Sequence, residues 1–202
     1  MKPIRTIIVM LALTVSACAT TSVSNEWKDP SWTGPPAAMV VVVGIAKSDT
    51  TRRIFEDTFA ADLNATGVHA IASYTQIQPG EANSTKLSDY VKSNSAEIVL
   101  VTRVQRVEQK VDVSPGYGPG GYGGVYGGYG RFYGWYGSAW ASQPVVTSYD
   151  VVTLETTVWE PGSEKLIWAA TTRRVASQDI PKVTSDLAHV LIPRLKSDHI
   201  IR

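Results

Sequence analysis

The sequence is poor in the residues that build metal sites and disulfides. Among its 202 residues are one cysteine, Cys18, and three histidines, His69, His189 and His199. A single thiol forms no disulfide within the chain, so packing must supply the stability. The histidines are not spaced as helix-borne metal ligands, and no second cysteine is available for a zinc site. We therefore expect no metal, and we expect each histidine to be a surface residue or a satisfied core residue.

A recognisable catalytic constellation is lacking as well. No Gly-x-Ser-x-Gly elbow marks a nucleophile. Three acidic residues in the region 51–65, Glu56, Asp57 and Asp62, are interpreted as the solvated face of a helix. The sequence thus predicts a protein that is not an enzyme and has no cofactor. Because a Ser-His-Asp site can assemble from distant residues, a hydrolase that uses His69 or His189 is an alternative.

The chain has neither a strong net charge nor an apolar run long enough to cross a membrane. Its 19 basic and 18 acidic residues give a formal net charge of +1. A near-neutral balance argues against nucleic acid as a partner and against a polybasic membrane patch. The apolar residues 7–15 fall far short of the ~20 residues that a spanning helix needs.

The amino-terminal region does contain the order of a bacterial export signal: basic residues, an apolar segment, small residues and a cleavage point. Lys2 and Arg5 precede the apolar segment, which ends in Val15-Ser16-Ala17-Cys18. An ordinary secretory signal has no need of this cysteine. The tetrad resembles the lipobox of bacterial lipoproteins, and the resemblance implies cleavage after residue 17 and diacylation of the Cys18 sulfur. Residues 1–17 are thus predicted to be a lipoprotein signal peptide.

In bacterial lipoproteins the residue after the acylated cysteine directs sorting. This sequence has Ala19 there, in place of the aspartate of an inner-membrane retention signal. The resemblance implies the outer membrane, with the domain in the periplasm; display at the cell surface is the alternative. Stable anchoring takes two signals. The resemblance supplies them as a diacylglycerol on the sulfur and an amide-linked chain on the new amino terminus.

The remaining sequence predicts a single α/β domain at residues 39–202, joined to the lipid by a tether at 18–38. The tether is rich in Ser, Thr and Pro, and its Trp27 and Trp32 indicate that part of it docks on the domain. The pattern predicts β-α-β-α-β, then a β-hairpin and a carboxy-terminal helix, in a mixed sheet packed by helices. The predicted strands are 39–45, 68–74, 98–113, 147–159 and 165–175, and the predicted helices are 51–65, 84–94 and one from about 180 that Pro193 should kink or end.

Between the third and fourth predicted strands lies a long Gly/Tyr-rich insertion, residues 114–144, whose only charge is Arg131. Its Gly-x-Gly-x-x-Gly spacings precede no helix pattern, so they predict no dinucleotide site. One arginine is too little for binding single-stranded nucleic acid. The insertion is either a mobile segment without a ligand or an adhesive tip, because tyrosine and tryptophan suit half-wet surfaces. The candidate partner-binding residues are Tyr117, Tyr122, Tyr126, Tyr129, Tyr133, Trp135, Tyr136 and Trp140.

Three further motifs resemble a family of small bacterial outer-membrane lipoproteins that has no assigned catalytic residues. They are Glu26-Trp27-Lys28-Asp29-Pro30, Thr51-Arg52-Arg53-Ile54-Phe55-Glu56-Asp57 and Tyr149-Asp150-Val151-Val152-Thr153-Leu154-Glu155. The order of elements is also similar to envelope domains such as the amino-terminal domain of TolB, the penicillin-binding-protein activator lipoproteins and the curli secretion lipoprotein. That second similarity concerns topology only, and a fold does not fix a function.

These features predict a non-enzymatic envelope protein, held in the membrane by lipid, that binds an envelope protein or peptidoglycan through the insertion. The curli secretion resemblance implies an alternative, a subunit of an oligomeric outer-membrane assembly or pore. For that role the region 104–113 alternates only weakly, with Gln109 on the face that would meet lipid. An envelope hydrolase is the second alternative. The sequence leaves the oligomeric state and the identity of the partner open.

Overall fold

The apolar run Met39–Ile45 is strand β2, which lies inside the sheet between two parallel neighbours, β3 (His69–Ala72) and β4 (Ile98–Ser114). Three successive side chains, Val40, Val41 and Val42, are wholly buried. Successive side chains of a strand point to opposite faces, so the sheet is covered on both sides here. This is the buried parallel strand that the sequence predicts.

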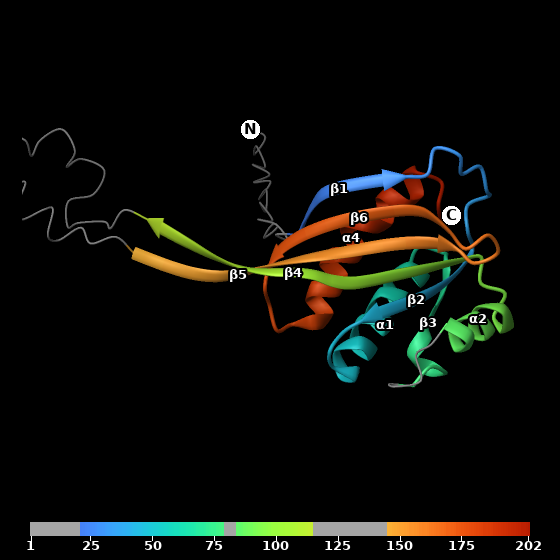
Figure 1. Ribbon diagram of the computed structural model, residues 1–202, viewed down its shortest axis with the longest axis horizontal. Helices are drawn as coiled ribbons and strands as arrows, with labels where there is room; N and C mark the ends of the chain where they lie inside the picture. The colour runs from blue at the N-terminus through green and yellow to red at the C-terminus, as the bar shows by residue number, and fades with distance from the viewer. Residues whose placement is uncertain (1–20, 79–83, 115–144) are drawn as a thin grey trace, which may run out of the picture.

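The computed structural model describes residues 21–78, 84–114 and 145–202. In this part of the chain a six-stranded mixed sheet and three α-helices form one α/β body (Figure 1). The strand order is β1-β6-β5-β4-β2-β3. The predicted mixed α/β class is confirmed, whereas the Gly/Tyr-rich residues 115–144 lie outside the described residues. The other elements are β1 (Ser22–Lys28), α1 (Asp49–Asn64), a short 3-10 helix (Ser73–Thr75), α2 (Ser84–Ser93), β5 (Val145–Glu160), β6 (Lys165–Val175) and α4 (Ile180–Ser197).

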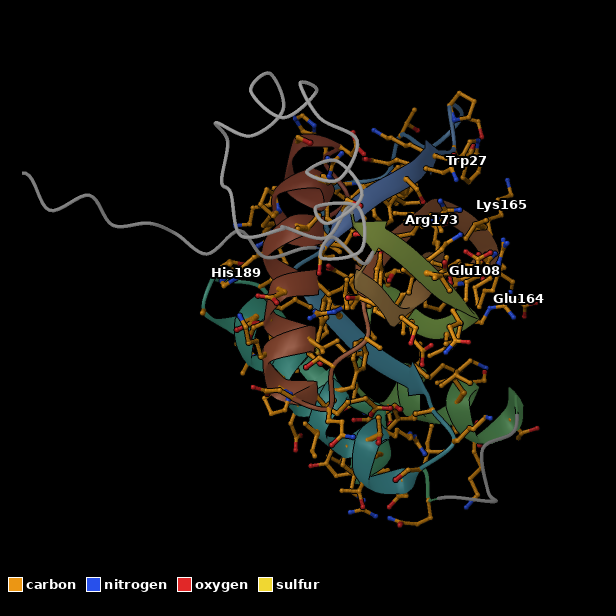
Figure 2. The ribbon with its side chains drawn as sticks, turned by 90° about the vertical axis from the view of Figure 1, so that its left-hand side faces the viewer. Trp27, Glu108, Glu164, Lys165, Arg173 and His189 are labelled. Carbon is orange, nitrogen blue, oxygen red and sulfur yellow. The ribbon has the colours of Figure 1, made fainter. Side chains whose placement is uncertain are left out.

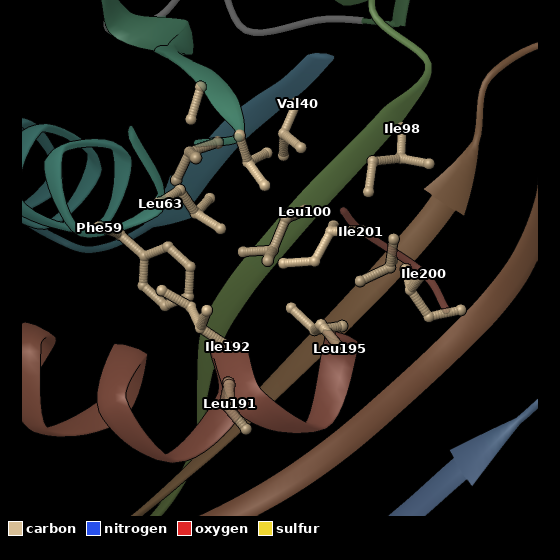
Figure 3. Close-up of a cluster of buried hydrophobic side chains, with 14 of the residues drawn as sticks. Val40, Phe59, Leu63, Ile98, Leu100, Leu191, Ile192, Leu195, Ile200 and Ile201 are labelled. Carbon is tan, nitrogen blue, oxygen red and sulfur yellow. The ribbon is translucent and has the colours of Figure 1, made fainter. Parts of the chain in front are cut away.

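Helices α1 and α4 pack against each other and cover one face of the sheet, and the main core lies beneath them (Figure 3). Side chains from both helices meet alternate residues of β2 and β4 there, among them Phe59, Leu63, Leu191, Ile98 and Leu100. Helix α2 covers the opposite face over β2, β3 and the start of β4. A smaller cluster fills that side, with Val41, Ile77, Tyr90, Val91 and Val99 buried.

The ends of the long helices follow from local chemistry, with one correction. Ser48 caps α1 and Asp179 caps α4, each accepting a backbone N–H bond three residues on. Pro193 does not end the last helix, which continues to Ser197. The final turn is retained because it places Leu195 wholly inside the core, and burying leucine outweighs one missing backbone hydrogen bond.

Residues 18–38, predicted as a tether with a docking stretch, are described from residue 21 onward, where they pack on the body and include a strand that was not predicted. Ser22–Lys28 is a strand at the sheet edge, antiparallel to β6. Before it, the buried Thr21 accepts a hydrogen bond from Arg174 at 3.4 Å. After it, Trp32 packs against the main core. Because an edge strand exposes most of its side chains, β1 has no apolar alternation from which to predict it.

Strands β4 and β5 extend beyond the rest of the sheet as a two-stranded ribbon (Figure 1). Their pairing runs without a break from Arg106 opposite Thr153 to Ser114 opposite Val145. Strand β2 leaves β4 at Arg103, and β6 leaves β5 at Val151. We call residues 107–114 and 145–152 the β4–β5 ribbon. At its base Val151 and Val152 still pair with β6, and beyond them β4 and β5 pair only with each other among the described residues. The two ends of the ribbon, Ser114 and Val145, lead directly into the Gly/Tyr-rich segment.

The main core makes a direct prediction about stability. Leu195→Ala removes a wholly buried side chain between α4 and the sheet, so we expect the free energy of unfolding to fall by about 2–5 kcal/mol. The control is His189→Ala, an exposed position on the same helix, which should change it by no more than about 0.5 kcal/mol. Urea denaturation followed by circular dichroism measures both. Equal midpoints for the two variants would contradict this account of the core.

Candidate functional site

The carboxylate of Glu56 is the first candidate for chemistry, because the side chain is wholly buried. This corrects the sequence interpretation of Glu56 as part of a solvated helix face. Its oxygens accept bonds from the backbone N–H groups of Gly44 at 2.9 Å and Tyr74 at 2.8 Å. They also accept bonds from Arg52 Nε at 2.9 Å and from Ser73 Oγ at 2.9 and 3.0 Å. Protein donors therefore occupy the whole carboxylate, which ties β2, α1 and the short 3-10 helix together.

We call this set of hydrogen bonds the lock around Glu56, and further contacts of Arg52 and Gly44 belong to it. Arg52 also donates to Ser73 Oγ at 2.9 Å and to the Ile77 carbonyl at 3.1 Å. Gly44 allows the close approach of α1, because a Cβ there would lie 2.8 Å from Phe55 Cδ1. The charged motif at the start of α1, which carries the family resemblance, thus fastens a helix to a strand end.

On the outer side of this lock, Tyr74 donates its hydroxyl hydrogen bond to the Asp57 carboxylate, at 2.8 and 2.9 Å. This bond raises the pKa of Tyr74, because the phenol must give up the proton that Asp57 accepts. The Arg53 guanidinium lies 4.9 Å from the centre of the Tyr74 ring and pairs with Asp49 at 2.7 Å. These contacts fix the surface of α1 and leave the tyrosine hydroxyl committed to a neighbour.

The three histidines are exposed and lie on separate parts of the fold. His69 starts β3, His189 is on α4 and His199 follows α4. Within residues 21–78, 84–114 and 145–202, no group of His, Cys, Asp and Glu side chains could hold a metal ion. In the same ranges no hydrogen bond joins His69 or His189 to a carboxylate or a hydroxyl. The hydrolase alternative therefore has no assembled site among these residues.

The sheet face opposite α1 and α4 is covered unevenly. Helix α2 lies over β2, β3 and β4, and on the outer strands β5, β6 and β1 this face carries two exposed tryptophans, Trp27 (47% exposed) and Trp159 (39%). Trp27 stands opposite Ala169, which stands opposite Thr157, so the three share a face. The Trp159 indole donates to Thr157 Oγ1 at 3.0 Å. Figure 2 shows Trp27 and Arg173 on this side, away from His189 on α4. We call this side of strands β5, β6 and β1 the open face.

The β4–β5 ribbon is the second unusual surface. Val107 and Val111 are 57% and 61% exposed and share one side of β4. Charged residues occupy the other side, where Glu108 accepts a bond from Arg106 at 2.8 Å and lies 3.6 Å from Lys110. The bond from Arg106, and then the charge of Lys110, lower the pKa of Glu108. An isolated two-stranded ribbon is marginally stable in water, which makes the exposed valines a notable feature of this surface.

The site residues predicted from sequence lie outside the described residues. These are the lipidation site Cys18 and the eight aromatic residues between Tyr117 and Trp140. The structure describes only the points where these segments join the body. The amino-terminal segment joins it at Thr21, and the aromatic segment joins the two ends of the ribbon. The open face was not predicted from sequence, because the edge strand that carries Trp27 was not predicted.

Comparison with known proteins gives structural similarity at low sequence identity. No protein family and no curated protein matches the sequence. A PelC dodecamer from Paraburkholderia phytofirmans is similar, with 17% identity over 90% of this chain and 99% of that chain and a TM-score of 0.47. Lipoprotein GNA1162 from Neisseria meningitidis has 12% identity over 80% and 99% of the two chains and a TM-score of 0.41.

A third structure is that of a putative neuraminyllactose-binding hemagglutinin homolog from Helicobacter pylori. It has 12% identity over 80% of this chain and 86% of that chain, with a TM-score of 0.37. The neighbours thus include a bacterial lipoprotein, but these identities are too low to transfer a function. None of the helices in the described ranges has the length and apolarity needed to cross a membrane.

The lock around Glu56 can be tested by Glu56→Gln. The amide replaces an acceptor oxygen by a donor that faces other donors, and it leaves Arg52 without its partner. We expect a loss of about 3–5 kcal/mol in the free energy of unfolding, typical of a broken buried ion pair. Asp57→Asn, one position along the same helix but exposed, should cost less than about 1 kcal/mol. Urea titration at pH 7 measures both, and a Gln variant as stable as the wild type would show that the carboxylate is not structural.

Proposed function

We propose that this chain is a lipid-anchored, non-enzymatic protein of the bacterial outer membrane that binds an envelope partner through its Gly/Tyr-rich segment. Acylation of Cys18 is the anchor, and the body faces the periplasm. The partner is an envelope protein or peptidoglycan. The observation that carries the proposal is the β4–β5 ribbon, which holds both ends of the aromatic segment away from the body.

Two features of the body support a binding role. The wholly buried carboxylate, Glu56, is saturated by protein donors, so it serves the fold. Most of the exposed large apolar side chains lie on the ribbon or on the open face, whereas Ile45 and Val104 lie on neither. Exposed apolar surface of this kind is typical of sites where proteins meet partners. Tyrosine and tryptophan, which dominate the segment between the ribbon ends, give large contact area together with a polar edge for hydrogen bonds.

An assembly of several copies is the second candidate. A membrane pore built from ribbons needs strands with a continuous apolar face. The valine side of this ribbon also carries Gln109 and, opposite it, the exposed Asp150. The ribbon chemistry therefore favours a docking role over a wall of a pore. Native mass spectrometry of the detergent-extracted protein distinguishes a monomer from a ring.

Replacing the anchor cysteine tests the first half of the proposal. Cys18→Ala should abolish fatty-acid labelling and move the protein from the membrane fraction to the soluble envelope fraction, because the sulfur carries the diacylglycerol. The control is Ser16→Ala, which keeps a small residue before the cysteine and should leave labelling and fractionation unchanged. A Cys18→Ala variant that still sediments with membranes would contradict lipid anchoring.

Removing the aromatic segment tests the second half. Replacing residues 116–141 by a short Gly/Ser linker should leave the urea midpoint unchanged, because the ribbon ends that the segment joins lie away from the main core. Co-sedimentation with peptidoglycan or with an envelope protein should be lost. In the chain without the deletion, a photoreactive residue at Tyr129 should capture that partner. A photoreactive residue at Glu164, in the exposed β5–β6 turn, is the matched probe and should capture little. Unchanged association after the deletion would show that the segment is not the binding element.

A further inference from the structure

Only a short piece of chain lies between the proposed anchor, Cys18, and the described body. Thr21 is buried and accepts a bond from Arg174, which itself lies 3.4 Å from Asp186. The chain is thus held from residue 21 onward. Two residues lie between Cys18 and Thr21, which makes three steps from Cα to Cα, and an extended chain spans at most ~3.6 Å per step, or ~11 Å here. An acylated Cys18 therefore keeps the bilayer surface close to the start of β1.

The start of β1 and the ribbon lie at the same end of the sheet. Strand register shows this directly: Ser22 stands opposite Arg173, Arg173 opposite Thr153, and Thr153 opposite Arg106. The chain thus enters the sheet level with the base of the ribbon, as Figure 1 also shows. From Arg106 the ribbon continues to Ser114, a length of ~27 Å at the usual rise of a strand.

The ribbon is therefore longer than the reach of the anchor. When the sheet stands with this end toward the bilayer, the ribbon must bend along the surface or enter it. When the β1 edge lies along the bilayer, the ribbon runs parallel to the surface. The second placement leaves β4 three strand spacings, ~14 Å, above the surface, so the first placement is the one that brings the side chains of the ribbon to the headgroups.

The side chains of the ribbon fit shallow contact with lipid. Val107 and Val111 are exposed on one side of the ribbon, with the polar pair Gln109 and Asp150 between them. Arg106, Glu108 and Lys110 lie on the other side. An open two-stranded ribbon has unpaired edges and cannot cross the hydrocarbon core. It can lie in the interface, where the backbone edges remain hydrated. Acidic and basic groups nearly balance on the charged side, so the contact is apolar and does not depend on anionic lipid.

We propose that the β4–β5 ribbon lies in the interface of the bilayer that holds the acylated terminus, with Val107 and Val111 in contact with lipid. This inference rests on the proposed acylation of Cys18. The ribbon then fixes the orientation of the body on the membrane and delivers the segment between its ends to the membrane surface. The partner of that segment is accordingly one that is itself exposed at this surface.

The test uses the full-length lipidated protein in phosphatidylcholine vesicles. Acylation consumes the only natural cysteine, so Val111→Cys offers a single thiol for an environment-sensitive fluorophore. We expect a blue-shifted emission and quenching by spin-labelled lipid about threefold or more above that of the controls, since interfacial burial excludes water. The controls are Lys110→Cys, on the charged side of the ribbon, and Glu164→Cys, in the turn at the far end of β5. The urea midpoint of each labelled protein verifies its fold.

The outcomes separate the two proposals. Protein that floats with the vesicles while residue 111 is quenched no more than residue 164 overturns the ribbon inference and leaves lipid anchoring intact. Equal quenching at 110 and 111 overturns the assigned side of the ribbon. Protein that fails to float, with Cys18 open to thiol reagents, overturns the anchor and the inference together. Shielding of residue 111 in whole envelopes but not in vesicles overturns the lipid contact in favour of a protein partner.

Discussion

The register between β4 and β5 is the constraint on which the rest of the fold depends. Strand β4 joins the parallel half of the sheet to the antiparallel half, since it pairs with β2 on one edge and β5 on the other. On the core side Leu100 faces Val158, and Thr102 shares a buried hydrogen bond of 2.9 Å with Thr156. A slip by one residue would expose the apolar pair and leave both hydroxyls unpaired, so the core selects a single register.

Three helices cover this sheet unequally, and the surfaces of interest follow from that. Helices α1 and α4 close one face, and α2 closes part of the other, so the outer antiparallel strands keep Trp27 and Trp159 accessible. Strands β4 and β5 are also longer than their neighbours: in the described part of the chain they extend past β2 and β6, which pair with them in the sheet. The candidate binding surfaces are thus parts of the sheet that the described helices do not cover.

Elements buried in the core could be predicted from sequence, and elements defined by tertiary contacts could not. The runs at 39–45 and 165–175 are strands with the predicted bounds, because apolar patterning reports burial. Strand β1 was missed because its pairing with β6 leaves most of it exposed. Glu56 was assigned to solvent because helical spacing cannot reveal that donors from Ser73 and Tyr74 would surround its carboxylate. The proposed sites at Cys18 and in the aromatic segment remain predictions.

The length of the ribbon bears on whether the Gly/Tyr-rich segment is a filler or a binding element. A hairpin that only joined β4 to β5 would close with about two to five residues just beyond Glu108, where β6 stops pairing with β5. Both strands instead continue as a paired ribbon to Ser114 and Val145. Val107 and Val111 are exposed on this extension. An extension of this kind costs ordering entropy for every residue, and of its described residues only Val152, at the base, packs against the main core. The proposed binding role of the segment gives a reason for this cost, because the ribbon separates Ser114 and Val145 from the body.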